Sequence, residues 1–138
     1  MKIKYKFLEH TADIKFQAFG ESIEEAFANS LTAMFHSMYK KKVEKKHQSK
    51  IKVKGRDTEN LLYNFLEEFL YMFDRKGIFL SKVDGIKIDR KKMQIECTFS
   101  WDSARKYKLN TAIKAVTYND MFIKNNGRNW TIQVVLDV

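Results

Sequence analysis

Two long segments of this chain carry apolar residues at helical spacing, and together they limit the fold more than any other feature. In the first, Ser22 followed by Glu25 is a capping-box pattern and predicts the start of a helix. In the second, Asp57 or Thr58 is expected to cap a helix that Gly77 ends. Each helix has one apolar stripe, formed by Ile23, Ala26, Phe27, Leu31, Met34, Phe35 and Met38 in the first and by Leu61, Leu62, Phe65, Leu66, Phe69, Leu70 and Phe73 in the second.

Much of the remaining chain alternates apolar and polar residues, as β-strands do. The alternation predicts strands in six runs: residues 3–7, 14–20, 51–53, 93–101, 113–123 and 130–136. Asn126 followed by Gly127 is a strong hairpin signal between the last two runs. We therefore predict an α+β fold with one domain, in which a mostly antiparallel sheet packs against two helices.

The composition is typical of a globular domain. The chain has 138 residues, of which 44% are hydrophobic, and this is enough to bury one core. No run approaches the ~20 apolar residues of a membrane helix, and the first residues lack the apolar core of a signal peptide. A single cysteine, Cys97, excludes an intrachain disulfide. We therefore expect a cytoplasmic protein with no membrane partner.

The net charge of +9 comes mainly from one segment. Residues 40–54 hold eight lysines and one glutamate. Runs of this kind are more often solvated loops or strand edges than binding sites, and this one contains no aromatic residue on which a base could stack. A contact with phosphate or RNA stays open for the first part of the segment, which contains Lys40, Lys41, Lys42, Lys45 and Lys46.

No familiar catalytic motif is present. The chain has no phosphate-binding loop, no glycine-rich dinucleotide fingerprint, no HExxH sequence and no cysteine pair for zinc. Cys97 falls on an apolar strand face and is expected to be a small buried hydrophobic residue. His36 and His47 are expected to face solvent without a role.

Two aspartates stand in unusual surroundings at opposite ends of the chain. Asp13 follows His10 and Thr11 in the connection of the first predicted hairpin, and Asp137 precedes Val138 after the last strand. Carboxylate oxygens are ligands that hard divalent cations accept. The residues alone leave two interpretations open: Asp13 satisfies the backbone of a turn, or it joins Asp137 and the terminal carboxylate around a divalent cation.

Four blocks of the sequence resemble the archease family and occur in its order. They read EHTADI at residues 9–14, NLLYNFLEE at 60–68, IKAVTY at 113–118 and VLDV at 135–138. The resemblance implies a single archease-like domain over residues 1–138. It also implies a protein that is not itself an enzyme but activates the tRNA-splicing RNA ligase, promoting guanylylation and repeated turnover of that ligase. RNA would be reached indirectly, through the ligase.

The resemblance also implies a metal site. Carried over by position, Asp13, Asp137 and Val138 would hold a divalent ion (Ca²⁺, Mg²⁺ or Mn²⁺). As our own hypothesis, His10 and Thr11 shape the loop that holds Asp13, and Lys114 contacts the partner or an anion. The chain departs from the family pattern where Asn119 and Tyr107 stand at positions that usually hold histidine, and a Gly-Glu pair common in the family is not recognisable around Phe99 to Asp102.

Two rival functions stay open at this point. The first is a metal-dependent phosphoesterase that uses the same carboxylates, although such sites generally gather more ligands. The second is a basic RNA-binding module that depends on residues 40–54, whose binding would weaken steeply with salt.

Overall fold

A computed structural model describes residues 3–9 and 12–138 of the chain. The described residues form two helices, seven strands and one short 3₁₀ turn. In chain order these are β1 (Tyr5–Leu8), β2 (Ile14–Gly20), α1 (Ile23–Met38), β3 (His47–Lys54), α2 (Thr58–Lys76), β4 (Ile78–Asp89), β5 (Gln94–Ser103), η1 (Ala104–Lys106), β6 (Ala115–Asn125) and β7 (Trp130–Asp137).

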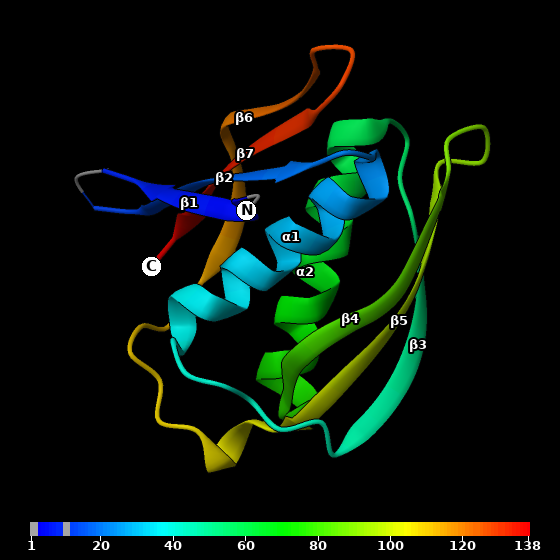
Figure 1. Cartoon of the computed structure of the whole chain (residues 1–138). Coiled ribbons are helices and arrows are strands. Elements are labelled where there is room, and N and C mark those ends of the chain that lie inside the picture. Colours follow the sequence, from blue (N-terminus) through cyan, green and yellow to red (C-terminus); the bar gives the residue numbers. More distant parts are fainter. Residues whose placement is uncertain (1–2, 10–11) are drawn as a thin grey trace.

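The strands form two separate sheets, and within each sheet all neighbouring strands are antiparallel. One sheet has the order β1-β2-β7-β6, and the other has the order β3-β5-β4. Both helices lie between the two sheets, with α1 against β2 and β4 and α2 against β6 and β3 (Figure 1). The predicted α+β class is therefore confirmed. The division into two sheets was not evident from the alternation of apolar residues.

Both helices begin, and α2 ends, where the sequence predicts. The Ser22 hydroxyl accepts a hydrogen bond from the Glu25 backbone N–H (3.1 Å), and Asp57 accepts one from Asn60 (2.7 Å), so each cap satisfies a free amide of the first turn. Gly77 ends α2 in the left-handed conformation, with φ of 65°. Both apolar stripes are buried except at Phe73, which is partly buried.

The centre of the core is aromatic and joins the helices to both sheets. Phe35 of α1 meets Phe69 of α2 edge to face, with ring centroids 6.3 Å apart, and meets Phe79 of β4 at 5.0 Å. Phe69 in turn packs on Phe99 of β5 at 4.8 Å. Edge-to-face pairs of this kind add to the free energy gained from burial alone. These rings therefore hold the β3-β5-β4 sheet onto the helices.

Three details of the strand prediction were wrong. The longest strand, β4, was not predicted, because its second half alternates only weakly around Gly85. Met93 was placed on the apolar face of β5, but it lies in the preceding turn with φ of 53°. Ile113 is buried yet precedes β6, which begins at Ala115.

Neither helix of the described residues combines the length and the apolar character that crossing a membrane would require. This agrees with the absence of a long apolar run in the sequence.

Gly20 allows β2 to pass directly under the first turn of α1. A Cβ atom at this position would lie 2.5 Å from the backbone nitrogen of Ala26, which cannot move without displacing the helix. We predict that Gly20→Ala lowers the free energy of unfolding by about 1–3 kcal/mol, measured by urea denaturation. Gly85→Ala is the matched control, since a Cβ there meets nothing within 4 Å. Equal stability of the two variants would contradict this account of Gly20.

Candidate functional site

The pairing of β2 with β7 brings the two ends of the chain together. The paired residues run from Gly20 opposite Trp130 to Ile14 opposite Leu136. Continued by one residue, this register sets Asp13 opposite Asp137. Asp137 is also paired on its other side with Ala115 of β6, and its carbonyl accepts a hydrogen bond from the Lys114 backbone N–H (2.8 Å). Three segments far apart in the sequence therefore meet at one end of this sheet.

The residues predicted for a site are placed as follows. Asp137 and Lys114 are exposed, and Asp13 and Val138 are partly buried. His10 and Thr11 lie outside the described residues.

A hollow of about 460 Å³ opens beside Asp13. It lies between the β1–β2 hairpin, the end of α1 and the segment after η1. Apolar and polar groups are mixed in its lining, which consists of Phe7, Leu8, Glu9, Asp13, Ile14, Lys15, Ser37, Lys40, Asn110 and Thr111. Phe7 is 42% exposed here, although its ring packs against Phe16. The hollow therefore offers an apolar surface to a partner's side chain next to the carboxylate of Asp13.

The donor chemistry at this end of the sheet suits a hard cation. Asp13 directly precedes β2 and Asp137 ends β7, so both bring a carboxylate to this end of the sheet, and Val138 adds further oxygens after Asp137. Among residues 3–9 and 12–138 no three His, Cys, Asp or Glu side chains are grouped closely enough to hold a metal ion. A cation at this end of the sheet would therefore need further ligands from backbone oxygens, water or a partner.

Strand β6 carries a wide bulge close to this site. Its register on β7 jumps between Thr117 and Phe122, and Asp120 within the bulge adopts φ of 54°. The bulge directs Tyr118 onto α2, where its ring stacks on Tyr63 with centroids 4.4 Å apart and its hydroxyl accepts from the Asn60 amide (2.8 Å).

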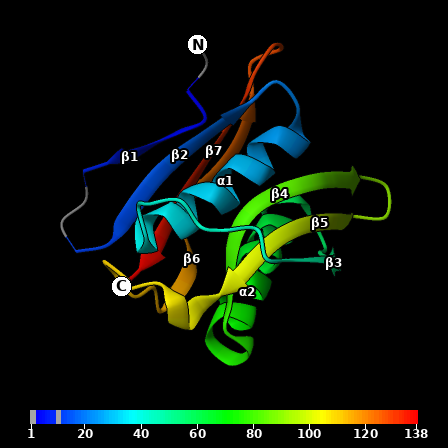
Figure 2. The same cartoon turned by 60° about the horizontal axis from the view of Figure 1, so that its bottom comes forward.

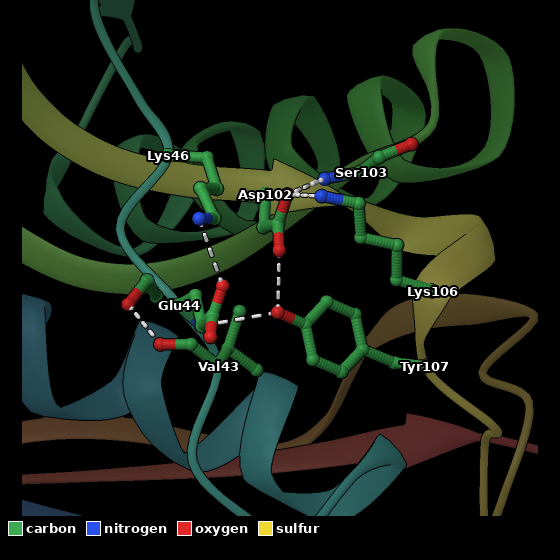
Figure 3. Close-up of polar contacts among 8 residues, drawn as sticks. Val43, Glu44, Lys46, Asp102, Ser103, Lys106 and Tyr107 are labelled. Atoms are coloured by element: carbon green, nitrogen blue, oxygen red, sulfur yellow. Dashed lines mark hydrogen bonds and ion pairs between the residues drawn. The ribbon is translucent and has the colours of Figure 1, made fainter.

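Asn119, which replaces a histidine of the family pattern, is exposed in this bulge, and its backbone N–H donates to the Thr117 hydroxyl (3.2 Å). The second residue that replaces a family histidine, Tyr107, is hydrogen-bonded to a buried side chain. Its hydroxyl donates to Asp102 Oδ2 (2.6 Å) and accepts from the Glu44 backbone N–H (3.0 Å), as Figure 3 shows.

Asp102 is 1% exposed, and sequence analysis did not single it out. Its carboxylate also accepts from the Ser103 N–H (2.8 Å) and from Lys106 Nζ (3.1 Å). The hydrogen bond from Tyr107, followed by those from Ser103 and Lys106, holds the pKa of Asp102 at about 2 despite burial, which raises it. The sequence signal that could have identified Asp102 was an acidic residue inside an apolar strand with a lysine four residues later.

The lysine-rich segment leaves α1 and runs along the molecule to β3 (Figure 2). Its second half is β3, an edge strand, as expected for a charged strand with one exposed face. Lys46 forms an ion pair with Glu44 (3.2 Å). The exposed side chains of Lys40, Lys41, Lys42 and Lys45 lie before β3.

The prediction for His36 was wrong. Its ring is partly buried, its Nδ1 atom is hydrogen-bonded to the Tyr5 hydroxyl, and its Nε2 atom is hydrogen-bonded to the Lys40 carbonyl (3.0 Å). His47 is exposed as predicted, and its ring lies 4.3 Å from that of Trp101. The prediction for Cys97 is confirmed: the residue is fully buried, and burial, with a smaller effect of Asp84, raises the pKa of its thiol to about 12.

Comparison with known proteins gives one consistent result. A sequence model of the Archease protein family (MTH1598/TM1083) matches residues 5–138. "Protein archease" of Sulfurisphaera tokodaii is 37% identical over 139 residues, covering 98% of this chain and 99% of that protein. "Protein archease" of Methanosarcina mazei is 36% identical over 140 residues, with 98% and 96% covered.

Two solved structures have the same fold. The solution structure of Methanobacterium thermoautotrophicum protein 1598 matches with a TM-score of 0.79 at 28% identity, covering 98% of this chain and 99% of that one. A crystal structure from Thermotoga maritima, described as an archease and possible chaperone, matches with a TM-score of 0.68 at 22% identity and covers 96% of each chain. The second likeness supports the fold alone.

The contact between Tyr107 and Asp102 yields a prediction about acid stability. We expect Tyr107→Phe to raise the pKa of Asp102 from about 2 toward its ordinary value of 3.8, followed by NMR titration of the carboxyl group. Because the pKa is depressed in the folded state, Asp102 stabilises the wild-type fold above pH 3.8, and this contribution is lost as the pH falls toward 2. The variant should therefore lose less stability across that interval. Tyr71→Phe, at an exposed ring, is the control, and an unchanged Asp102 pKa in Tyr107→Phe would contradict the assignment.

Proposed function

The chain belongs to the archease family, and from this membership we propose that it activates a tRNA-splicing RNA ligase. In this proposal the protein is a cofactor that promotes guanylylation and repeated turnover of the ligase and catalyses no reaction itself. The observation that supports the proposal is the meeting of two signature segments: β2 pairs with β7 as far as Ile14 opposite Leu136, so Asp13 and Asp137 come next to this pair at the same end of the sheet. A chance likeness in two separate blocks would not require them to be adjacent in space.

The acidic end of the β1-β2-β7-β6 sheet is the proposed working surface. Asp13 and Asp137, with oxygens of Val138, would hold a divalent ion such as Ca²⁺, Mg²⁺ or Mn²⁺, and their oxygen donors fit all three. When bound, the ion would neutralise charge on phosphate groups during nucleotidyl transfer. The two side chains supply too few ligands for a closed site, and this suits a surface that is completed when a partner docks.

Neighbouring groups have supporting roles in the proposal. His10 and Thr11 would shape the loop that carries Asp13. Lys114 holds the Asp137 backbone through its N–H, while its exposed side chain is available to the ligase or to an anion. Phe7 and the hollow beside Asp13 would receive an apolar side chain of the ligase, since aromatic residues in pockets commonly dominate binding energy. The proposal implies a cytoplasmic protein, which would meet the ligase in that compartment.

The decisive test is single-turnover guanylylation of a cognate ligase with and without this protein. We expect the wild type to raise the rate and Asp13→Asn and Asp137→Asn each to remove at least about 90% of the increase, as losses of charge-stabilising groups often cost tenfold or more. Asp89→Asn is the matched control. It removes one negative charge at the last residue of β4, on the other sheet, and an asparagine oxygen can still accept the hydrogen bonds from the Lys91 and Lys92 backbone N–H groups of the following turn.

Normal stimulation by both folded aspartate variants would reject the acidic-site mechanism. Stimulation that is absent even with the wild type would reject the ligase assignment. In that case hydrolysis of phosphate esters in the presence of Mn²⁺ would test the phosphoesterase alternative directly, using the same variants.

A further inference from the structure

Six lysines from separate parts of the chain line one hollow beside the end of α1. The hollow has a volume of about 430 Å³ and lies between β1, the end of α1, the segment before β3 and strand β4. The lysines are Lys4, Lys40, Lys41, Lys42, Lys45 and Lys82. Four belong to the lysine-rich run seen in the sequence, and Lys4 and Lys82 are added by the fold.

No acidic residue of the described chain lines this hollow. Three other hollows on the described surface each combine lysine with acidic residues. The hollow beside Asp13 includes Glu9 and Asp13, another includes Glu21 and Glu25, and another includes Glu67 and Glu68. The lysine hollow therefore concentrates one sign of charge, which attracts anions and raises their local concentration.

The carboxylate of Asp84 interacts with two of these lysines but is hydrogen-bonded to other residues. Asp84 accepts hydrogen bonds from Ser100 and from Gln48, and its pKa is lowered first by the Ser100 bond and to a smaller extent by Lys45 and Lys82. It therefore offsets part of the charge of two lysines at one end of the hollow. The other four lysines, Lys4, Lys40, Lys41 and Lys42, line the hollow without a carboxylate among the lining residues.

The backbone that carries these lysines is fixed. The Val43 carbonyl accepts from the Ser81 hydroxyl (2.6 Å), and Val43 is 8% exposed. The Glu44 N–H is held by Tyr107, whose own partner is the buried Asp102 (Figure 3). Farther along, the Lys46 N–H donates to the Trp101 carbonyl (3.1 Å). A charged run that was expected to be a solvated loop is thus a positioned element, and positioning reduces the entropy lost on binding.

The hollow also has the aromatic groups that the lysine-rich run lacks. Tyr5 and Tyr39 are partly buried residues of its lining and come from β1 and from the end of α1. His36 also lines the hollow, and it is hydrogen-bonded to the Tyr5 hydroxyl through Nδ1 and to the Lys40 carbonyl through Nε2. Aromatic faces beside a basic groove are the usual elements of single-strand recognition.

We propose that this lysine hollow binds the phosphate backbone of single-stranded RNA. The lysines neutralise successive phosphates, and the partly buried Tyr5 and Tyr39 lie in the same lining, where a base would meet them. The proposal is independent of ligase activation, since it concerns direct binding of RNA by this chain. It also replaces the expectation that the run from residue 40 is idle solvated charge.

The test is fluorescence anisotropy of a short labelled single-stranded RNA with the whole protein and no ligase. We compare the wild type with a triple variant of the hollow, Lys41→Gln/Lys42→Gln/Lys82→Gln, and with a control triple, Lys50→Gln/Lys54→Gln/Lys87→Gln. Both triples remove the same charge from exposed positions, and the control residues lie on β3 and β4 outside the hollow. Circular dichroism confirms that each variant is folded.

We expect the hollow triple to weaken binding at least about tenfold and to lower the slope of log affinity against log salt by about 2, near 0.7 for each phosphate that is no longer neutralised. The control triple should change both quantities much less. Equal weakening by the two triples would mean attraction by overall charge and would overturn the proposal. Displacement of the RNA by an equimolar amount of GTP would also overturn it, because the hollow would then be a site for a free nucleotide.

Discussion

The pairing of β2 with β7 is the constraint on which the rest of the structure depends. It joins residues near the start of the chain to residues near its end, so a loop of almost the whole sequence must close before it forms. Once formed, it creates the central pair of the β1-β2-β7-β6 sheet. Its buried face then receives α1, and its end carries Asp13 and Asp137. The same pairing thus organises the core and the acidic surface.

The core holds the second sheet in place through aromatic rings rather than through strand pairing. Phe35, Phe69 and Phe79 link α1, α2 and β4, and Tyr39 continues this series to Tyr107 with centroids 5.1 Å apart. Tyr107 reaches the buried carboxylate of Asp102 and the backbone of Glu44. The lysine-rich segment is therefore positioned by the core, although its own side chains contribute little to it.

Local patterns predicted the helices well and the contacts between distant segments poorly. Ser22, Asp57 and Gly77 cap or end a helix through contacts within one turn of their own positions, so these helix ends could be predicted from the neighbouring residues in the sequence. The placement of Asp13 beside Asp137 came from resemblance to a family, since periodicity carries no information on which strands pair. Tyr118 was expected within a regular strand, but a bulge directs it to Tyr63, and no spacing in the sequence announced this.

The acidic and basic surfaces are not independent in space, because both lie at the end of α1 and share Lys40. This residue lines the hollow beside Asp13 and also the lysine hollow, and its carbonyl is held by His36. An RNA strand in the lysine hollow would therefore extend toward the surface proposed for the ligase. A protein that assists an RNA-joining enzyme gains from such an arrangement, since one molecule could contact the substrate and the active-site entrance together. The opposite charges would keep the two proposed functions distinct, because phosphates would be drawn to the lysines and repelled from the aspartates unless a cation is bound between them.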